Sequence, residues 1–326
     1  MSLIVQKFGG SSLSSAGKVL HVAHIIQRTR AAGHRVIAVL SAQGDTTDVL
    51  LDRAHELAAQ PDPRELDMLL AAGEQMSVAL CAIALRRLDV PAVSLCAWQV
   101  PICSDGTHTD ARIERIGHER VKAELDAQRV VLVAGFQAVD EAGDLTTLGR
   151  GGSDTSAVAL AEAFHAELCQ IYTDVDGIYT TDPRICPQAR RIDCLPYAQM
   201  HLLASRGAQV LHARSVALAQ RAGVTVEVRS CEPDSRGSRV TAQAPAADVV
   251  GVTKRAGAQT GLAEITAVGG ALPSAAHERL AIAALERAGI AVRAVEAGAD
   301  HFALLVDIGR ADEALCLVHG ALFPER

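Results

Sequence analysis

Aromatic residues are scarce in this chain, with one Trp, three Tyr and five Phe among 326 residues. The short basic clusters Arg86-Arg87 and Arg190-Arg191 have no interleaved aromatics, and the formal net charge is −7. Proteins that bind nucleic acid or anionic membranes usually carry an extended basic surface. The composition therefore predicts that neither nucleic acid nor a membrane is a partner.

Long apolar runs and paired cysteine motifs are also missing. The nearest candidate for a membrane span, residues 68–85, is broken by Gly73-Glu74-Gln75. The first residues lack the charged segment and long apolar run that mark a secretory signal. The eight cysteines show no CxxC pair and no Cys/His metal spacing. We therefore expect reduced, mostly buried thiols in a cytoplasmic protein.

The pattern that is present alternates apolar strands with helices, which predicts an α/β fold. Hydrophobic residues make up 49% of the chain, enough for one large domain and a small one. Strands are predicted at 3–8, 35–42, 91–96, 129–136, 167–175 and 224–230, and helices at 16–32, 46–59, 64–88, 110–128 and 196–222, with another after residue 152. Such alternation is typical of a three-layer αβα sandwich with a largely parallel sheet.

A composition change at 241–248 predicts a linker after this first domain, 1–240. Beyond it, residues 249–326 read as strand, helix, strand, strand, helix, with a possible extra strand at 249–253. This order predicts a small ferredoxin-like domain.

The motif "TTLGRGGSDTSA" lies where the predicted helix after residue 152 begins. Glycines allow a close backbone approach, and a helix start offers free N–H groups to an anion. Arg150 is suited to hold a carboxylate by two parallel hydrogen bonds. An ordinary turn capped by Ser153 or Asp154 is the alternative interpretation.

Other polar motifs follow the predicted strands. "KFGGSS" places Lys7 at the end of the first strand, either to neutralise phosphate or as a surface lysine. "AAGEQMS" places Glu74 in apolar surroundings, where it needs a substrate amine or an arginine as partner. "TDVDGIYTTDPR" (173–184) is consistent with a nucleotide site or with turns alone.

The motifs and their order along the chain resemble the aspartokinase branch of the amino acid kinase family. These motifs are KFGGSS, SAQGDTTD, GEQMS, TTLGRGGSDTSA, TDVDGIYTTDPR and "GAQVLHARSVALA" (207–219). The resemblance runs from residue 3 to about 240 and implies the amino acid kinase fold followed by an ACT-type domain. Since ACT domains often pair edge to edge, it also implies a homodimer through that domain.

The resemblance assigns roles to particular residues. Arg150 would bind the substrate α-carboxylate, Asp154 and Glu74 its ammonium group, and Ser153 with Thr47 its side-chain carboxylate. Lys7, Gly9 and Gly10 would meet the γ-phosphate of ATP. The implied nucleotide contacts are Ser11, Thr173, Asp174, Tyr179, Asp182 and Arg184, with Mg²⁺ as cofactor and its ligands unassigned.

The implied reaction is transfer of the γ-phosphoryl group of ATP to the β-carboxylate of aspartate, the first step of the aspartate-derived amino acid pathway. Gln209 stands where the family usually has Lys, Gln75 replaces an Arg, and there is room for one ACT unit instead of two. These departures leave open a kinase for another acidic amino acid, or a non-catalytic subunit that binds amino acids and regulates another kinase.

Overall fold

The computed structural model describes residues 2–324 and divides into two compact units. Unit 1 contains residues 1–176 and 217–237, and unit 2 contains residues 177–216 and 238–326. Helix α8 (Ala213–Ala222) includes the point where the chain returns from unit 2 to unit 1. The expected domains, 1–240 and 249–326 with a linker at 241–248, remain a prediction.

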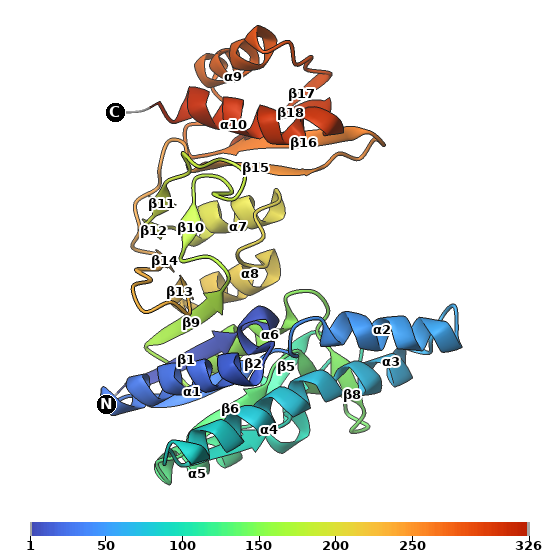
Figure 1. Cartoon of the computed structure of the whole chain (residues 1–326), viewed down its shortest axis with the longest axis vertical. Coiled ribbons are helices and arrows are strands. Elements are labelled where there is room, and N and C mark those ends of the chain that lie inside the picture. The colour runs from blue at the N-terminus through green and yellow to red at the C-terminus, as the bar shows by residue number, and fades with distance from the viewer. Residues whose placement is uncertain (1, 325–326) are drawn as a thin grey trace. The chain divides into compact units, whose positions relative to one another are not determined.

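Unit 1 is built on a parallel sheet, labelled in Figure 1. Its strands lie in the order β13-β9-β1-β2-β6-β3, and each neighbouring pair is parallel. Their bounds are β1 Leu3–Phe8, β2 Arg35–Leu40, β3 Ala92–Leu95, β6 Val130–Ala134, β9 Leu168–Thr173 and β13 Val226–Ser230. The α/β fold with a largely parallel sheet is confirmed.

Helices cover both faces of this sheet. On one face, α1 (Ala16–Ala31) and α4 (Ala72–Arg87) pack through a cluster that includes Ile26, Leu85 and Leu40. Helix α6 (Gly152–Ala163) packs on β1, β2 and β9. Because strand side chains alternate between faces, the neighbours of buried Phe8 in β1 point away from the α1 cluster. This alternation directs Lys7 toward α6.

Several predicted elements differ from the observed ones. The predicted helix 110–128 is wrong in its first half, which forms β5 (Ile113–Ile116) before α5 (Glu119–Asp126). Strand β5 joins a second sheet, ordered β5-β4-β7-β8, that the sequence patterns missed. The other three strands are β4 Ile102–Ser104, β7 Gln137–Val139 and β8 Leu145–Thr147. Three-residue strands are too short to show a hydrophobic period.

Two predicted long helices are each broken. Residues 64–88 form α3 (Pro63–Leu70) and α4, and residues 196–222 form α7 (Tyr197–Ser205) and α8. Helix α2 (Thr46–Leu57) matches its prediction closely. Three 3₁₀ turns complete the described helices: η1 Gly10–Leu13, η2 Ala97–Gln99 and η3 Ile308–Arg310.

By length and composition alone, the segment Pro63–Arg87 could span a membrane, because an 18-residue window within it has a mean hydropathy of 1.7. However, 56% of that window is buried inside the protein. Val78, Cys81 and Leu85 of α4 lie in the core beside α1. Core packing therefore explains one face of α4, whereas Met76, Leu80 and Ile83 on the same helix are exposed.

The C-terminal part of unit 2 is an antiparallel sheet with two helices. The strand order is β15-β16-β18-β17, with α9 (Ala275–Arg287) and α10 (Ala311–Leu322) following β16 and β18. The strands are β15 Gly251–Ala256, β16 Leu262–Val268, β17 Ala294–Ala297 and β18 His301–Asp307. This confirms the predicted βαββα order with an extra leading strand, and a buried core around Phe302 and Leu304 holds it together.

The remaining strands of unit 2 are short. Strands β10 (Ile178–Tyr179) and β11 (Arg191–Ile192) form an antiparallel pair, and β12 (Cys194–Leu195) pairs in parallel with β14 (Ser238–Val240).

The cysteines depart from the expectation that all would be reduced. Cys186 and Cys316 form a disulfide within unit 2, with Cα atoms 5.4 Å apart. Three other cysteines, Cys81, Cys96 and Cys169, are buried free thiols, as expected. The sequence could not indicate the disulfide because the two cysteines are 130 residues apart and meet only when α10 packs beside the loop that holds Cys186.

Candidate functional site

The carboxyl ends of β1, β2, β6 and β9 lie at one edge of the parallel sheet, where ligands bind in open α/β folds. Lys7 stands near the end of β1, and its Nζ is 2.7 Å from Oδ1 of Asp154 in the first turn of α6. Both side chains are largely buried, with 13% and 12% exposed. The ion pair fixes the lysine ammonium at the start of α6. The helix dipole favours the negative charge of Asp154 at this position.

The glycines after β1 allow the chain to pass close to its neighbours. A methyl group on Gly10 would lie 2.7 Å from the carbonyl oxygen of Ala42, and Gly10 itself accepts a hydrogen bond from Gly44 N. A methyl group on Gly9 would lie 3.5 Å from Lys7 Nζ. The Gly9–Gly10 backbone therefore lies beside both the Lys7 ammonium and the loop that follows β2.

Glu74 lies in the first turn of α4 and is 3% exposed. Its Oε1 accepts a hydrogen bond from Ala42 N at 2.9 Å, and its Oε2 is buried with no hydrogen-bond partner in the described chain. Burial raises the pKa of Glu74 to about 7, although the Ala42 hydrogen bond lowers it in part. The residue therefore holds an unused acceptor next to the loop after β2.

The start of α6 explains why its motif is rich in glycine. Gly149 and Gly151 have φ angles of +68° and +71°, a region that disfavours other residues. Gly151 is the N-cap and supplies no side chain, so the first N–H groups of α6 have no side-chain cap. The N–H groups and the dipole at such a helix start favour an anion. Arg150 between these glycines is exposed, and its guanidinium makes no hydrogen bond or ion pair within residues 2–324.

Ser153 lies beside the loop that follows β6. A methyl group on Gly135 would be 2.8 Å from Ser153 Oγ, so only glycine fits there. The next residue, Phe136, has a φ of +68°, a conformation that costs energy for a bulky side chain. Its N–H donates to Ser156 Oγ in α6. The loop is thus shaped around the start of α6.

Asp67 supports the Gly-rich loop that precedes α6, a role that was not predicted from the sequence. It is fully buried in α3 and accepts hydrogen bonds from Thr147 Oγ1 at 2.5 Å and from Thr109 N at 2.9 Å. Since Thr147 directly precedes Leu148-Gly149-Arg150, Asp67 positions the start of the Gly-rich loop. A single Asp in an amphipathic helix gives no sequence signal for such a role.

The other predicted residues of unit 1 lie at the same edge. Ser11 is exposed in η1, and Thr47 is half-buried in the first turn of α2. Thr173 ends β9, and its hydroxyl donates to Asp174 Oδ1 at 3.1 Å. Parallel strand pairing therefore collects residues from four separate motifs at one edge.

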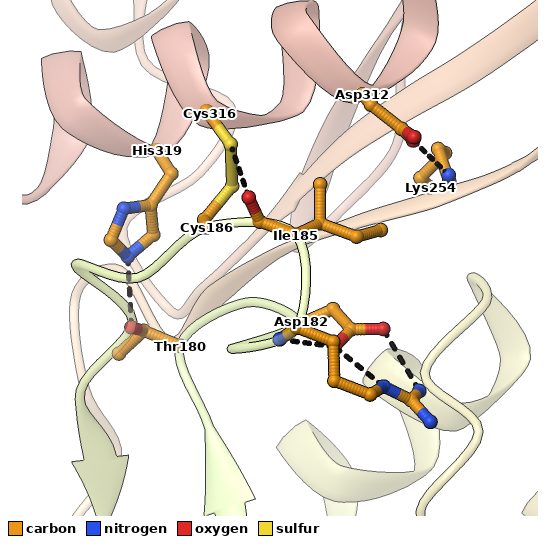
Figure 2. The surroundings of a disulfide bond; sticks show 9 residues. Thr180, Asp182, Ile185, Cys186, Lys254, Asp312, Cys316 and His319 are labelled. Carbon is orange, nitrogen blue, oxygen red and sulfur yellow. Dashed lines mark hydrogen bonds and ion pairs between the residues drawn. A yellow bond between two sulfur atoms is a disulfide. The ribbon is translucent and has the colours of Figure 1, made fainter.

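Three predicted nucleotide residues belong to unit 2. Tyr179 ends β10, and Asp182 and Arg184 follow in a turn. Arg184 donates to Asp182 through Nε at 3.0 Å and Nη2 at 2.9 Å, and this pairing holds the pKa of Asp182 below its usual range. Figure 2 shows Asp182 near the disulfide.

Thr180, inside the same motif, is bound on several sides. Its backbone N–H donates to Arg190 O, and its carbonyl accepts from Val252 N in β15 at 2.8 Å. Its hydroxyl is 2.9 Å from His319 Nε2 in α10 (Figure 2). Burial and the charge of Arg190 lower the pKa of His319, so this ring is neutral near pH 7. The C-terminal sheet and helix thus hold the middle of the motif.

The sequence profile of the amino acid kinase family matches residues 2–230, and the chain belongs to that family. It is 48% identical to an aspartate kinase of Pseudomonas putida over 241 residues, covering 74% of this chain and 59% of that protein. An aspartokinase of Bacillus sp. is 47% identical over 238 residues, 73% of this chain and 58% of that protein. The chain thus spans less than two thirds of the length of these relatives.

Solved structures show the same fold. Escherichia coli aspartokinase III, crystallised with aspartate and ADP, superposes with a TM-score of 0.85 at 23% identity, over 98% of this chain and 100% of that one. Aspartate kinase from Synechocystis gives a TM-score of 0.67 at 30% identity, over 98% of this chain and 69% of that one.

Glu74 generates a stability prediction. Its pKa rises from 4.5 in the unfolded chain to about 7 in the native state, so the native state holds the extra proton between these values. The free energy of unfolding should therefore fall as pH rises from 4.5 to 7, by up to about 3 kcal/mol. Glu74→Gln should lack this pH-dependent loss of stability. In urea denaturation, the free energy of unfolding of the variant should therefore rise relative to that of the wild type as pH increases. Glu56→Gln on α2 is the exposed control, and a pH-independent difference would contradict the assignment.

Proposed function

We propose that this chain transfers the γ-phosphoryl group of ATP to the β-carboxylate of L-aspartate, giving aspartyl β-phosphate and ADP. The observation that carries the proposal is the buried pair of Lys7 and Asp154 at the start of α6, set between two Gly-rich loops. The printed names of its relatives, aspartate kinase and aspartokinase, support the same reaction.

In this proposal the amino acid binds at the α6 end of the sheet. Arg150 binds the α-carboxylate because its exposed guanidinium makes no competing ion pair within residues 2–324. Asp154 and the unused Oε2 of Glu74 bind the ammonium group. Ser153 and Thr47 orient the side-chain carboxylate. One cationic fork, two carboxylates and two hydroxyls match the charges of an acidic amino acid.

The nucleotide contacts of the proposal are the residues that the resemblance implies, Ser11, Thr173, Asp174, Tyr179, Asp182 and Arg184. Lys7 and the backbone of Gly9 and Gly10 face the γ-phosphate. Mg²⁺ would arrive with the ATP phosphates, since residues 2–324 contain no group of three His, Cys, Asp or Glu side chains able to hold a metal. Magnesium in kinases commonly binds through substrate phosphates and few protein ligands.

The chemistry then needs positioning more than proton transfer. The β-carboxylate is ionised at neutral pH and is the nucleophile, so no general base is required. A carboxylate oxygen forms a bond to the γ-phosphorus as the bond to the β-phosphate oxygen breaks. Lys7 stabilises negative charge on the transferred phosphoryl group, and Asp154 keeps the Lys7 ammonium in place.

An assay of ADP release with hydroxylamine trapping tests this function. Aspartate should give an acyl hydroxamate, and Lys7→Ala should lower kcat about 100-fold or more because a preorganised charge is lost. Lys122→Ala, an exposed change on α5, should leave kcat unchanged. Turnover with another acidic amino acid but not aspartate would favour a specialised kinase. No turnover with any acceptor would favour a regulatory subunit.

Arg150→Lys tests which substrate the Gly-rich loop binds. The variant keeps the charge but loses the two parallel hydrogen bonds, so KM for the amino acid should rise about tenfold or more while KM for ATP changes little. Initial rates with each substrate varied in turn provide the measurement. Arg53→Lys on α2 is the control. A larger effect on KM for ATP would place the loop at the nucleotide.

We further propose a cytoplasmic protein whose C-terminal sheet is an ACT-type domain that forms a homodimer. The support is β17, an edge strand in which all four residues, Ala294–Ala297, are exposed. An exposed edge offers unpaired N–H and C=O groups to a second copy.

Val295→Lys tests the dimer, because a charge on each copy would be placed at the shared edge. The variant should shift the monomer–dimer equilibrium toward monomer by about tenfold, measured by sedimentation velocity. Leu280→Lys on α9, also exposed, should behave as wild type. Unchanged association of the Val295 variant would show that β17 is not the contact.

A further inference from the structure

The disulfide ties the end of the TDVDGIYTTDPR motif to the C-terminal helix. Cys186 follows Arg184 by two residues, and Cys316 lies in the middle of α10 (Figure 2). The six other cysteines are free, and among them Cys194 is exposed in the same unit. The bond therefore connects α10 to the proposed nucleotide segment, residues 173–184.

The turn that carries Asp182 and Arg184 ends at the disulfide. Cys186 N and Ile185 N both donate to the carbonyl oxygen of Asp182, at 2.9 and 3.1 Å. Cys186 is fully buried. Fixing its sulfur therefore fixes the turn that presents the Asp182–Arg184 pair.

A second contact holds the other side of this turn. Thr180 is bound to His319 in α10 and to Val252 in β15. These hydrogen bonds do not depend on the disulfide. If the disulfide opens, the turn stays attached at Thr180 and loses its covalent attachment at Cys186, so the change is confined to the residues between them.

Cys316 is the less buried of the two bonded cysteines, since Cys186 is fully buried. Cys316 is partly exposed, and it lines a groove of about 470 Å³ between α9 and α10. Small residues such as Ala284 and Gly320 leave this groove open, and the exposed Arg287 lies at its wall. A cationic wall suits an anionic thiol.

We propose that Cys186 and Cys316 form a thiol–disulfide exchange site for a low-molecular-weight anionic thiol such as glutathione, which enters the groove beside Arg287 and so controls ATP binding. The effect on ATP rests on the proposed nucleotide role of Tyr179, Asp182 and Arg184. Disulfides in a reducing compartment are usually regulatory or catalytic, not permanent.

The exchange balances in both directions. In reduction, a thiolate of glutathione attacks Cys316 Sγ, and Cys186 leaves as a thiolate and takes a proton from water. A second glutathione thiolate attacks the mixed disulfide, releasing glutathione disulfide and the Cys316 thiolate. Two electrons pass from two glutathione molecules to the protein disulfide. Oxidation by glutathione disulfide reverses these steps.

The first test compares the full chain after treatment with glutathione disulfide or excess glutathione, with intact mass reporting the state of the bond. KM for ATP should rise on reduction by about fivefold or more, the lower end of measured coupling factors. Cys316→Ser should behave as the reduced protein in both treatments, and Cys194→Ser as wild type. A change below about twofold, with the bond shown to open and close, overturns control of ATP binding.

A second readout does not require kinase activity. Trypsin cleavage after Arg184 should be faster in the reduced protein, because the turn then loses its covalent attachment at Cys186, whereas cleavage after the exposed Arg293 should not change. If no acceptor is phosphorylated but this difference appears, the proposed function fails and the redox-controlled turn stands. Equal cleavage rates in both states overturn the tether itself.

The groove is tested by the choice of thiol. Arg287→Glu should slow reduction by anionic glutathione relative to reduction by cationic cysteamine, because the charge at the wall is reversed. Arg279→Glu on the same helix, which does not line the groove, is the matched control. An equal effect on both thiols would exclude the groove as the site of recognition.

Discussion

The ion pair between Lys7 and Asp154 is the contact around which unit 1 is arranged. A lysine whose side chain is 13% exposed needs a partner of opposite charge, and removing one member of a buried pair typically costs about 3–5 kcal/mol. Forming it requires β1 to lie at the centre of the sheet and α6 to begin at Gly152 against that strand. This one contact therefore depends on the strand order, on the direction of the Lys7 side chain and on the position at which α6 begins.

Close backbone approach is the second constraint at this edge. Gly10 lies against Ala42, Gly135 against Ser153, and Gly152 against Phe136, each at a distance that a methyl group would violate. Phe136 adopts a positive φ in the middle of this arrangement. Such strain persists only where surrounding contacts over-determine the backbone. Here the Phe136 N–H donates to Ser156 Oγ, and the Phe136 carbonyl accepts from Leu148 N. These contacts hold the backbone at the edge, and a preformed site favours binding because less ordering remains to be done.

In unit 2 the proposed nucleotide segment and the C-terminal sheet form one body. Thr180 contacts both β15 and α10, and Gly251 allows β15 to come within reach of the Thr180 carbonyl. The ACT-like part therefore has a structural role beside any role in dimer formation. A change in α10 has a direct route to Asp182 and Arg184 through Thr180 and Cys186.

The sequence by itself determined the alternation of strands and helices and the motifs that follow each strand. Hydrophobic period and glycine position are local signals, so Lys7, Glu74, Arg150 and Asp154 could be named as candidates before their distances were known. The short strands of the second sheet and the break at Ala71 had no such signal, because three-residue strands carry no period.

Only the tertiary structure decided which of these residues meet. It paired Lys7 with Asp154, gave Glu74 a backbone partner instead of an arginine, and brought the unrecognised Asp67 under the Gly-rich loop. It also joined Cys186 to Cys316, against the expectation of reduced thiols. Contacts between residues far apart in the chain depend on register, strand order and side-chain direction acting together, and no short stretch of sequence contains that information.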